Sequence, residues 1–193
     1  MNDTERPTWC DIDLTALENN YKAIQTHVGN TEVMPIVKAD AYGHGLAQVA
    51  TKLEELNVPC LGVAYVEEGV SLRQAGITTP IHVLGGAVER QIPLFLEHNL
   101  VFTAPSVDKL CQINEAAEAA NTKAAVHLKI DTGMERIGVH HYNAETLFGA
   151  ALQCPAVEVE GVFTHFASAD QPDLEFAGVQ LERFLEALEF YPQ

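Results

Sequence analysis

Lys38 occupies a position at which a side-chain amine could do chemistry. It directly follows the apolar run Val33–Val37, which is typical of a buried strand, and the next residues, Ala-Asp-Ala-Tyr-Gly-His-Gly, indicate a turn before a helix. Apolar surroundings at a strand end would partly desolvate the ammonium and favour the neutral amine, which forms a Schiff base with an aldehyde. The alternative is a lysine that reaches past the strand end into solvent, and the strand alone leaves both open.

A second group of polar residues follows a later predicted strand. Lys129 lies near the end of that strand, and Arg136 follows a turn that contains Gly133. The guanidinium of Arg136 could therefore stand over the strand ends, where its planar and permanently charged fork suits a carboxylate. His165 comes just after the next strand, and a lone histidine in such a place is more often a structural hydrogen-bonding group than a catalyst.

The four cysteines indicate neither metal nor redox chemistry. Cys10, Cys60, Cys111 and Cys154 are scattered without a Cys-x-x-Cys pair, so no zinc knuckle or redox dithiol is predicted. We expect four reduced and mostly buried thiols. The acidic residues near the N-terminus are accompanied by no further ligands at definable spacing, so no metal site is predicted.

Short β-rich apolar runs alternate with helical patterns along the chain. Strands are predicted at Val33–Val37, Cys60–Tyr65, Pro80–Leu84, Leu100–Ala104, Ala124–Ile130 and Val157–Phe163. Helices are predicted at Leu14–His27, Leu46–Leu56, Val66–Ala75, Glu89–His98, Val107–Ala120, Ala144–Leu152 and Leu174–Leu188. Ser106 suits a helix N-cap, and Gly76 suits a helix end. The strand spacing leaves room for one helix between strands, which favours a parallel (β/α) barrel or a doubly wound sheet, each with its site at the carboxyl ends of the strands.

The composition is that of a globular chain with a strong negative charge. The 193 residues include 27 acidic and 11 basic ones, a net charge of −16, and 47% are hydrophobic, which excludes a disordered tail. Without a cluster of Lys and Arg, nucleic acid and anionic membrane surfaces are not expected partners. The N-terminus lacks the basic start and apolar run of a secretory signal, and no run of about 18 apolar residues occurs, so a cytoplasmic protein is predicted.

Four segments together resemble the bacterial alanine racemases. VKADAYGHG, which contains Lys38, is very similar to the lysine motif that binds pyridoxal 5'-phosphate in that family, and residues 6–14, 129–138 and 161–170 match the family in the same order. The resemblance spans the chain and implies an α/β fold, a parallel (β/α) barrel of the alanine racemase type. Because a complete eightfold barrel takes about 250 residues, about six of eight βα units are expected here. Residues 1–193 would form a truncated N-terminal pyridoxal-phosphate-binding barrel domain, with the family's C-terminal β domain absent.

The resemblance implies a role for each candidate residue. Lys38 would bind the cofactor as a Schiff base and move a proton on one face of the substrate α-carbon. Tyr42 would reach the cofactor phosphate, its alternative being an amphipathic residue at the rim. Arg136 would bind the substrate carboxylate and the phenolic oxygen of the cofactor. His165 would support an arginine on the strand that follows in the family.

Lys129 matches a lysine that many family members carry as an adduct with carbon dioxide. Two unpaired cations, Lys129 and Arg136, would repel each other in a semi-buried site, whereas a carbamate is negative and can hold the arginine in place. The alternative is an ordinary lysine paired with Asp131 or another acid.

The implied activity is interconversion of L-alanine and D-alanine, which supplies D-alanine for peptidoglycan, by an enzyme that is a homodimer at full length. The base on the opposite face would be a tyrosine of the second domain, so the chain alone is expected to be inactive and, with uncovered strand edges, prone to self-association. The alternatives are a non-catalytic pyridoxal-phosphate-binding barrel or regulatory fragment, and a serine racemase or related amino-acid decarboxylase. The decarboxylases and the small binding barrels usually lack the AYGHG and DTGM-x-R elements present here.

Overall fold

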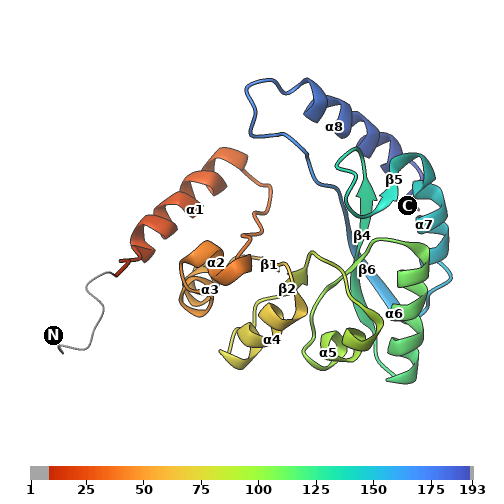
Figure 1. The fold of residues 1–193 in the computed structure, drawn as a ribbon, viewed down its shortest axis with the longest axis horizontal. Coiled ribbons are helices and arrows are strands. Elements are labelled where there is room, and N and C mark those ends of the chain that lie inside the picture. Colours follow the sequence, from red (N-terminus) through yellow and green to blue (C-terminus); the bar gives the residue numbers. More distant parts are fainter. Residues whose placement is uncertain (1–8, 192–193) are drawn as a thin grey trace.

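A computed structural model describes residues 9–191 as an α/β structure whose elements follow an open arc (Figure 1). Helix α1 lies at one end of the arc and α8 at the other, and the strands lie on its inner side. The helices are α1 (Leu14–Val28), α2 (Lys38–Gly43), α3 (Leu46–Glu55), α4 (Val66–Gln74), α5 (Ile92–Glu97), α6 (Val107–Ala119), α7 (Ala144–Ala151) and α8 (Glu175–Leu188), with short 3-10 turns η1 (Glu89–Gln91) and η2 (His141–Asn143). The strands are β1 (Leu61–Val63), β2 (Ile81–Val83), β3 (Phe102–Ala104), β4 (Ala124–Asp131), β5 (Val139–His140) and β6 (Val157–Phe163).

All strand pairs of the described residues are parallel. β1 pairs with β2, β3 with β4, and β4 with both β5 and β6. Single parallel bridges, Ile36 to Gly62 and His82 to Val101, continue this order on both sides of the β1–β2 pair. Successive parallel strands joined by helices form an incomplete α/β barrel, as predicted, and the carboxyl ends of the strands lie at one end of it.

The prediction of a strand at Val33–Val37 is wrong, because this segment forms a single bridge and no strand. Only Ile36 forms a bridge, and the pairing consists of Gly62 N donating to Pro35 O and Val37 N donating to Gly62 O, each at 2.8 Å. Pro35 has no backbone N–H for a longer ladder, and the chain turns into α2 directly after Val37. The other five predicted strands are present, although β1, β2 and β3 are shorter than expected.

Local signals in the sequence set several helix ends. The Ser106 hydroxyl accepts a hydrogen bond from Lys109 N at 3.2 Å, which confirms it as the N-cap of α6. Gly76, with φ of 89°, follows the end of α4 in the left-handed region that glycine adopts at little cost. Asp13 caps α1 by accepting from Thr15 N and Ala16 N.

The main core lies between the strands and helices α3 to α7, where Phe95 and Phe102 stack with ring centroids 4.3 Å apart. Helix α1 contributes no buried residue to this core. The cysteine prediction is wrong in part, because only Cys154 is buried and Cys10 and Cys111 are exposed. Among residues 9–191, no helix combines the length and apolar character that a membrane crossing requires.

Candidate functional site

The segment after Lys38 is a left-handed helical turn. Ala39, Asp40, Ala41 and Tyr42 have φ between 52° and 56° and ψ between 36° and 54°. For residues with a Cβ this conformation costs roughly 1–2 kcal/mol each, so the turn must be held by its surroundings. Lys38 is half-buried, and its Nζ lies 5.9 Å from the centroid of the exposed Tyr42 ring.

Lys129 is buried on β4, with only 3% of its surface exposed. Its Nζ donates to Ile130 O at 3.0 Å and lies 5.1 Å from the Phe163 ring centroid. Burial lowers the pKa of Lys129 to about 8, with a smaller lowering by the Arg136 charge, and the negative charge of Asp131 partly opposes both. The pairing of Lys129 with Asp131 that the sequence left open is not a direct ion pair in the described residues.

The Asp131 carboxylate instead organises the loop that leads to Arg136. It accepts backbone hydrogen bonds from Gly133 N at 2.8 Å and from Glu135 N and Arg136 N at 3.2 Å. These bonds outweigh desolvation and lower the pKa of Asp131. The loop packs closely against β4 at Gly138, where a Cβ would lie 3.0 Å from the Lys129 backbone oxygen, so glycine fits this position best. The loop leaves the Arg136 side chain exposed.

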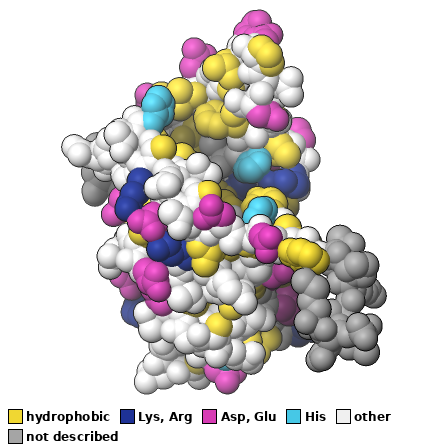
Figure 2. Space-filling view, turned by 90° about the vertical axis from the view of Figure 1, so that its left-hand side faces the viewer, with side chains coloured by type: hydrophobic (Ala, Val, Ile, Leu, Met, Phe, Trp, Pro, Cys, Tyr) yellow, Lys and Arg dark blue, Asp and Glu magenta, His cyan; other side chains and the backbone are white. Residues whose placement is uncertain are grey.

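His165 lies two residues beyond β6, close to the three candidate cations. The pKa of His165 is lowered first by burial and then by the charges of Arg136, Lys129 and Lys38. Strand pairing places these residues at one end of the strands. Lys129 pairs with Phe163, so the loop that carries Arg136 and the segment that carries His165 both follow the carboxyl ends of neighbouring strands. Lys38 directly follows the segment that bridges to β1, at the same end. Figure 2 shows histidine and basic side chains gathered on one face beside a hollow lined with hydrophobic ones.

Two residues that support this group gave no signal in the sequence. Gln180 is fully buried on α8; its Nε2 donates to His165 O at 3.0 Å and its Oε1 accepts from Ala167 N at 2.9 Å. Glu68 on α4 accepts three backbone hydrogen bonds, one of them from Ala39 N beside Lys38. In the sequence, Gln180 belongs to an amphipathic helix and Glu68 to an acidic pair typical of a solvated helix face, so neither pattern points to a contact with a distant loop.

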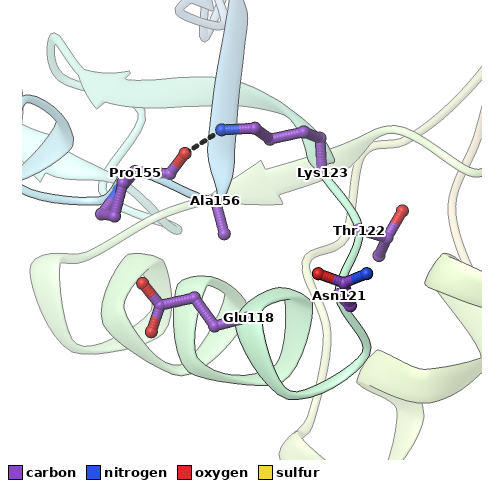
Figure 3. Close-up of a pocket in the computed structure, with 6 residues that line it drawn as sticks. All are labelled: Glu118, Asn121, Thr122, Lys123, Pro155 and Ala156. Carbon is purple, nitrogen blue, oxygen red and sulfur yellow. Dashed lines mark hydrogen bonds between the residues drawn. The ribbon is translucent and has the colours of Figure 1, made fainter.

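A shallow pocket of about 360 Å³ lies at the opposite end of the strands. Figure 3 shows its lining around the starts of β4 and β6, where Lys123 donates to the Pro155 carbonyl. It is formed by the residues Glu118, Asn121, Thr122, Lys123, Pro155 and Ala156. A site at this end is remote from Lys38 and Arg136, and in α/β barrels the amino ends of the strands serve stability rather than catalysis.

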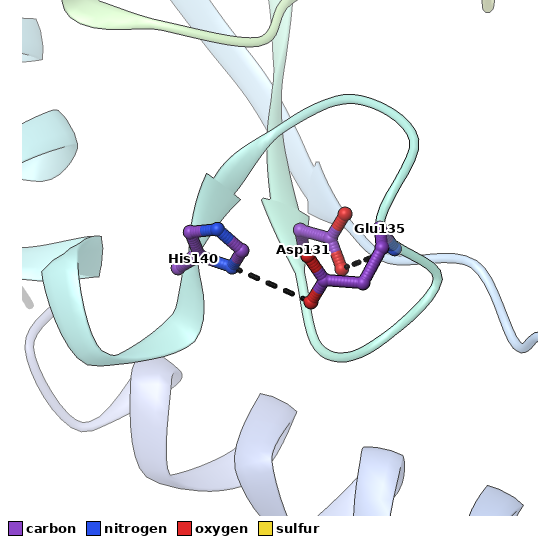
Figure 4. Close-up of side chains that lie close together, drawn as sticks. All are labelled: Asp131, Glu135 and His140. Atoms are coloured by element: carbon purple, nitrogen blue, oxygen red, sulfur yellow. Dashed lines mark hydrogen bonds and ion pairs between the residues drawn. The ribbon is translucent and has the colours of Figure 1, made fainter.

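Asp131, Glu135 and His140 form a close polar group beside β5 (Figure 4). Their ligand atoms lie within 4.8 Å of one another, and His140 Nδ1 lies 3.7 Å from a Glu135 oxygen. Asp131 already accepts hydrogen bonds from three backbone N–H groups, so the hydrogen bonds of the loop explain why these three side chains lie close together.

The residues at the strand ends fit pyridoxal phosphate in their chemistry. Lys38 supplies an amine that can bind an aldehyde, and Lys38 and Arg136 bring positive charge to the strand ends of a chain of net charge −16. An anionic aldehyde cofactor and an amino acid with a free carboxylate both match such a cluster.

Comparison with known proteins identifies the family. Residues 12–193 match the model of the alanine racemase N-terminal domain. The chain is 40% identical over 185 residues to an alanine racemase of Halothermothrix orenii, covering 95% of this chain and 49% of that protein, and 38% identical over 187 residues to one of Geobacter sulfurreducens, with 95% and 49% covered.

Solved structures agree with the sequence comparison. An alanine racemase of Clostridium difficile 630 superposes with a TM-score of 0.92 at 34% identity, covering 97% of this chain and 50% of that one. An alanine racemase of Bacillus anthracis with bound L-Ala-P has a TM-score of 0.87 at 33% identity, with 96% and 48% covered. A histidine racemase of Leuconostoc mesenteroides shares the fold, with a TM-score of 0.88 at 25% identity and 94% and 49% covered. The chain spans about half the length of the curated relatives it matches, and it belongs to the alanine racemase family through their N-terminal domain.

Proposed function

We propose that this chain is the pyridoxal-phosphate-binding barrel domain of an alanine racemase, which interconverts L-alanine and D-alanine. The observation that carries the proposal is the position of Lys38, Lys129, Arg136 and His165 at the carboxyl ends of parallel strands, in a chain that belongs to this family. The wider role follows from the same proposal: a cytoplasmic, homodimeric enzyme that supplies D-alanine for peptidoglycan.

Lys38 is the residue proposed to hold the cofactor and to exchange a proton with one face of the α-carbon of alanine. When bound, pyridoxal phosphate supplies a conjugated ring that delocalises the electron pair left behind by that proton. Tyr42 lies beside Lys38 and is 60% exposed, and its hydroxyl is proposed to bind the phosphate group. His165 is proposed to support an arginine of a longer chain, with its backbone held by Gln180.

Arg136 is proposed to bind the carboxylate of the substrate and the phenolic oxygen of the cofactor, because it is the exposed guanidinium of the group. Lys129 is proposed to carry carbon dioxide as a carbamate. Its pKa of about 8, lowered by burial, leaves part of the amine neutral near neutral pH, and the neutral amine attacks carbon dioxide and releases a proton. Intact-mass measurement in bicarbonate should show a labile adduct that Lys129→Ala lacks; the same adduct on both proteins would contradict the assignment.

Reductive trapping tests the cofactor site directly. The chain is incubated with pyridoxal phosphate, reduced with borohydride and mapped by peptide mass. We expect the label on Lys38 and its loss in Lys38→Arg. A label found mainly on Lys22, Lys52, Lys109, Lys123 or Lys129 would refute the assignment.

The substrate is tested by assaying loss of the L enantiomer of alanine, serine and histidine. The assay uses this chain and a longer chain that includes whatever coding sequence follows residue 193. We expect the longer protein to act on alanine in preference to the other two. Turnover of serine or histidine above that of alanine would contradict the proposed substrate while leaving the cofactor site in place.

A further inference from the structure

The carboxylate of Glu68 joins the turn that carries Lys38 to the end of strand β1. Its Oε1 accepts from Ala39 N at 2.6 Å, and its Oε2 accepts from Ala64 N at 2.8 Å and Tyr65 N at 3.0 Å. Because each oxygen serves a different segment, one side chain sets the spacing between them. Glu68 is half-buried in the first turn of α4, where the helix dipole favours a negative charge.

The turn depends on such a contact because its backbone conformation is unfavourable. Ala39 to Tyr42 are all left-handed, without a glycine among them. The other hydrogen bonds of the turn are local: Ala41 N donates to Val37 O, Gly45 N to Asp40 O, and Leu46 N to the Asp40 carboxylate. Within residues 9–191, Glu68 provides the side-chain hydrogen bond that reaches this turn from another element.

We infer that Glu68 is a positioning residue for Lys38, an inference that rests on the proposed function of Lys38 in binding the cofactor. The amide that Glu68 holds belongs to Ala39, the residue directly after Lys38. Without that bond the left-handed turn can relax, and the direction of the Lys38 side chain changes with the backbone to which it is attached. Glu68 itself does not touch the reacting atoms in this scheme.

The test replaces Glu68 by glutamine, which keeps the shape of the side chain. The amide nitrogen is a donor and cannot accept from a backbone N–H. In the place of Oε1 it loses only the bond from Ala39, whereas in the place of Oε2 it would lose the bonds from both Ala64 and Tyr65, so the Ala39 bond is the one expected to be lost. Glu67→Gln is the matched control, since Glu67 is the exposed neighbour on the same helix and bonds Gln91 instead. Both variants and the wild type are compared by the rate of borohydride trapping at Lys38 and by amide hydrogen exchange of residues 39–46.

We expect trapping at Lys38 to slow about tenfold in Glu68→Gln and not in Glu67→Gln, because the backbone N–H of Ala39 loses its side-chain acceptor only in the first. Hydrogen exchange of residues 39–46 should rise in Glu68→Gln, while the peptides of β4 and β6 stay protected as in the wild type. This second measurement also shows that the variant is folded.

Two results would overturn the inference or the function behind it, and they are distinct. Wild-type trapping rates together with unchanged exchange in Glu68→Gln would remove the positioning role. Absence of trapping at Lys38 in the wild type would instead refute the proposed cofactor site. In that case faster exchange of residues 39–46 in Glu68→Gln still supports Glu68 as the residue that holds the turn, and unchanged exchange overturns it.

Discussion

Lowering the pH from 7 to 5 is expected to destabilise this chain by about 2 kcal/mol through His82 alone. His82 is fully buried on β2, facing His127 with ring centroids 4.2 Å apart. The Thr103 hydroxyl donates to Val83 O at 2.8 Å, so it must accept from His82 Nε2 at 2.9 Å. Nε2 therefore carries the proton, and the buried Nδ1 has no hydrogen-bond partner in the described residues.

The magnitude follows from the difference between the folded and unfolded proton affinities. Burial, with a smaller effect of His127, lowers the pKa of His82 from 6.5 to about 3. At a pH between these two pKa values, His82 binds a proton in the unfolded chain but not in the folded chain, so the free energy of unfolding falls as the pH falls. At pH 5 the histidine of the unfolded chain is 1.5 pH units below its pKa, which corresponds to about 2 kcal/mol at 1.36 kcal/mol per unit.

Urea unfolding followed by circular dichroism at pH 7, 6 and 5 measures this loss. His82→Leu removes the titrating group, and His27→Gln on the exposed face of α1 serves as the control. The free energy of unfolding of the wild type and of His27→Gln should fall about 2 kcal/mol more than that of His82→Leu over this range. Parallel losses in all three proteins would refute the reasoning, because His82 would then titrate alike in the folded and unfolded chains.

Four further predictions follow from other features of the structure. Ala39→Gly should leave the stability unchanged or raise it, because glycine adopts the left-handed conformation freely. Ala23→Gly in the right-handed helix α1 should lower the stability by about 1 kcal/mol. Equal losses of stability for the two variants in thermal unfolding would contradict the left-handed turn. Burial lowers the pKa of Lys129 to about 8, so in buffer free of carbon dioxide Lys129→Met should raise the free energy of unfolding at pH 7 by about 2–3 kcal/mol. For the same reason the wild type should gain stability as the pH rises from 8 to 10.5. An unchanged denaturation midpoint in Lys129→Met would argue against a buried, charged Lys129. Hydrogen bonds from the backbone and hydroxyl groups of Thr78 and Thr79 lower the pKa of Glu54 to about 2. Glu54→Gln should therefore lower the free energy of unfolding at pH 7 by about 1 kcal/mol after allowance for solvent screening. In urea titrations this difference from the wild type should disappear as the pH falls from 4.5 to 2. In a longer protein that racemises alanine, Arg136→Lys should lower kcat/KM although the charge is kept, because the planar fork is lost; wild-type kinetics would show that Arg136 is a surface residue.

The sequence by itself determined the alternation of strands and helices and the order of the candidate residues along the chain. Apolar periodicity and caps are local, so β6 begins and ends at the predicted residues and Ser106 caps α6 as expected. Because parallel strands present their carboxyl ends at one edge, the alternation also predicted a site at that edge, where Lys38 and Arg136 follow strand ends. The strand predicted before Lys38 failed, since apolar content alone does not show that Pro35 and the turn after Val37 limit its pairing.

Only the tertiary structure decided how those residues are held. The left-handed turn at residues 39–42 is supported by Glu68, which lies 29 residues beyond Ala39 in the chain, and no local pattern encodes that contact. Burial also distinguishes the two cations of one motif. Lys129 is buried in the interior, whereas Arg136 is exposed on a loop that the carboxylate of Asp131, the last residue of β4, holds by hydrogen bonds. Proton affinities and backbone strain depend on neighbours that are distant in sequence, and these neighbours are in place only when the strands have paired.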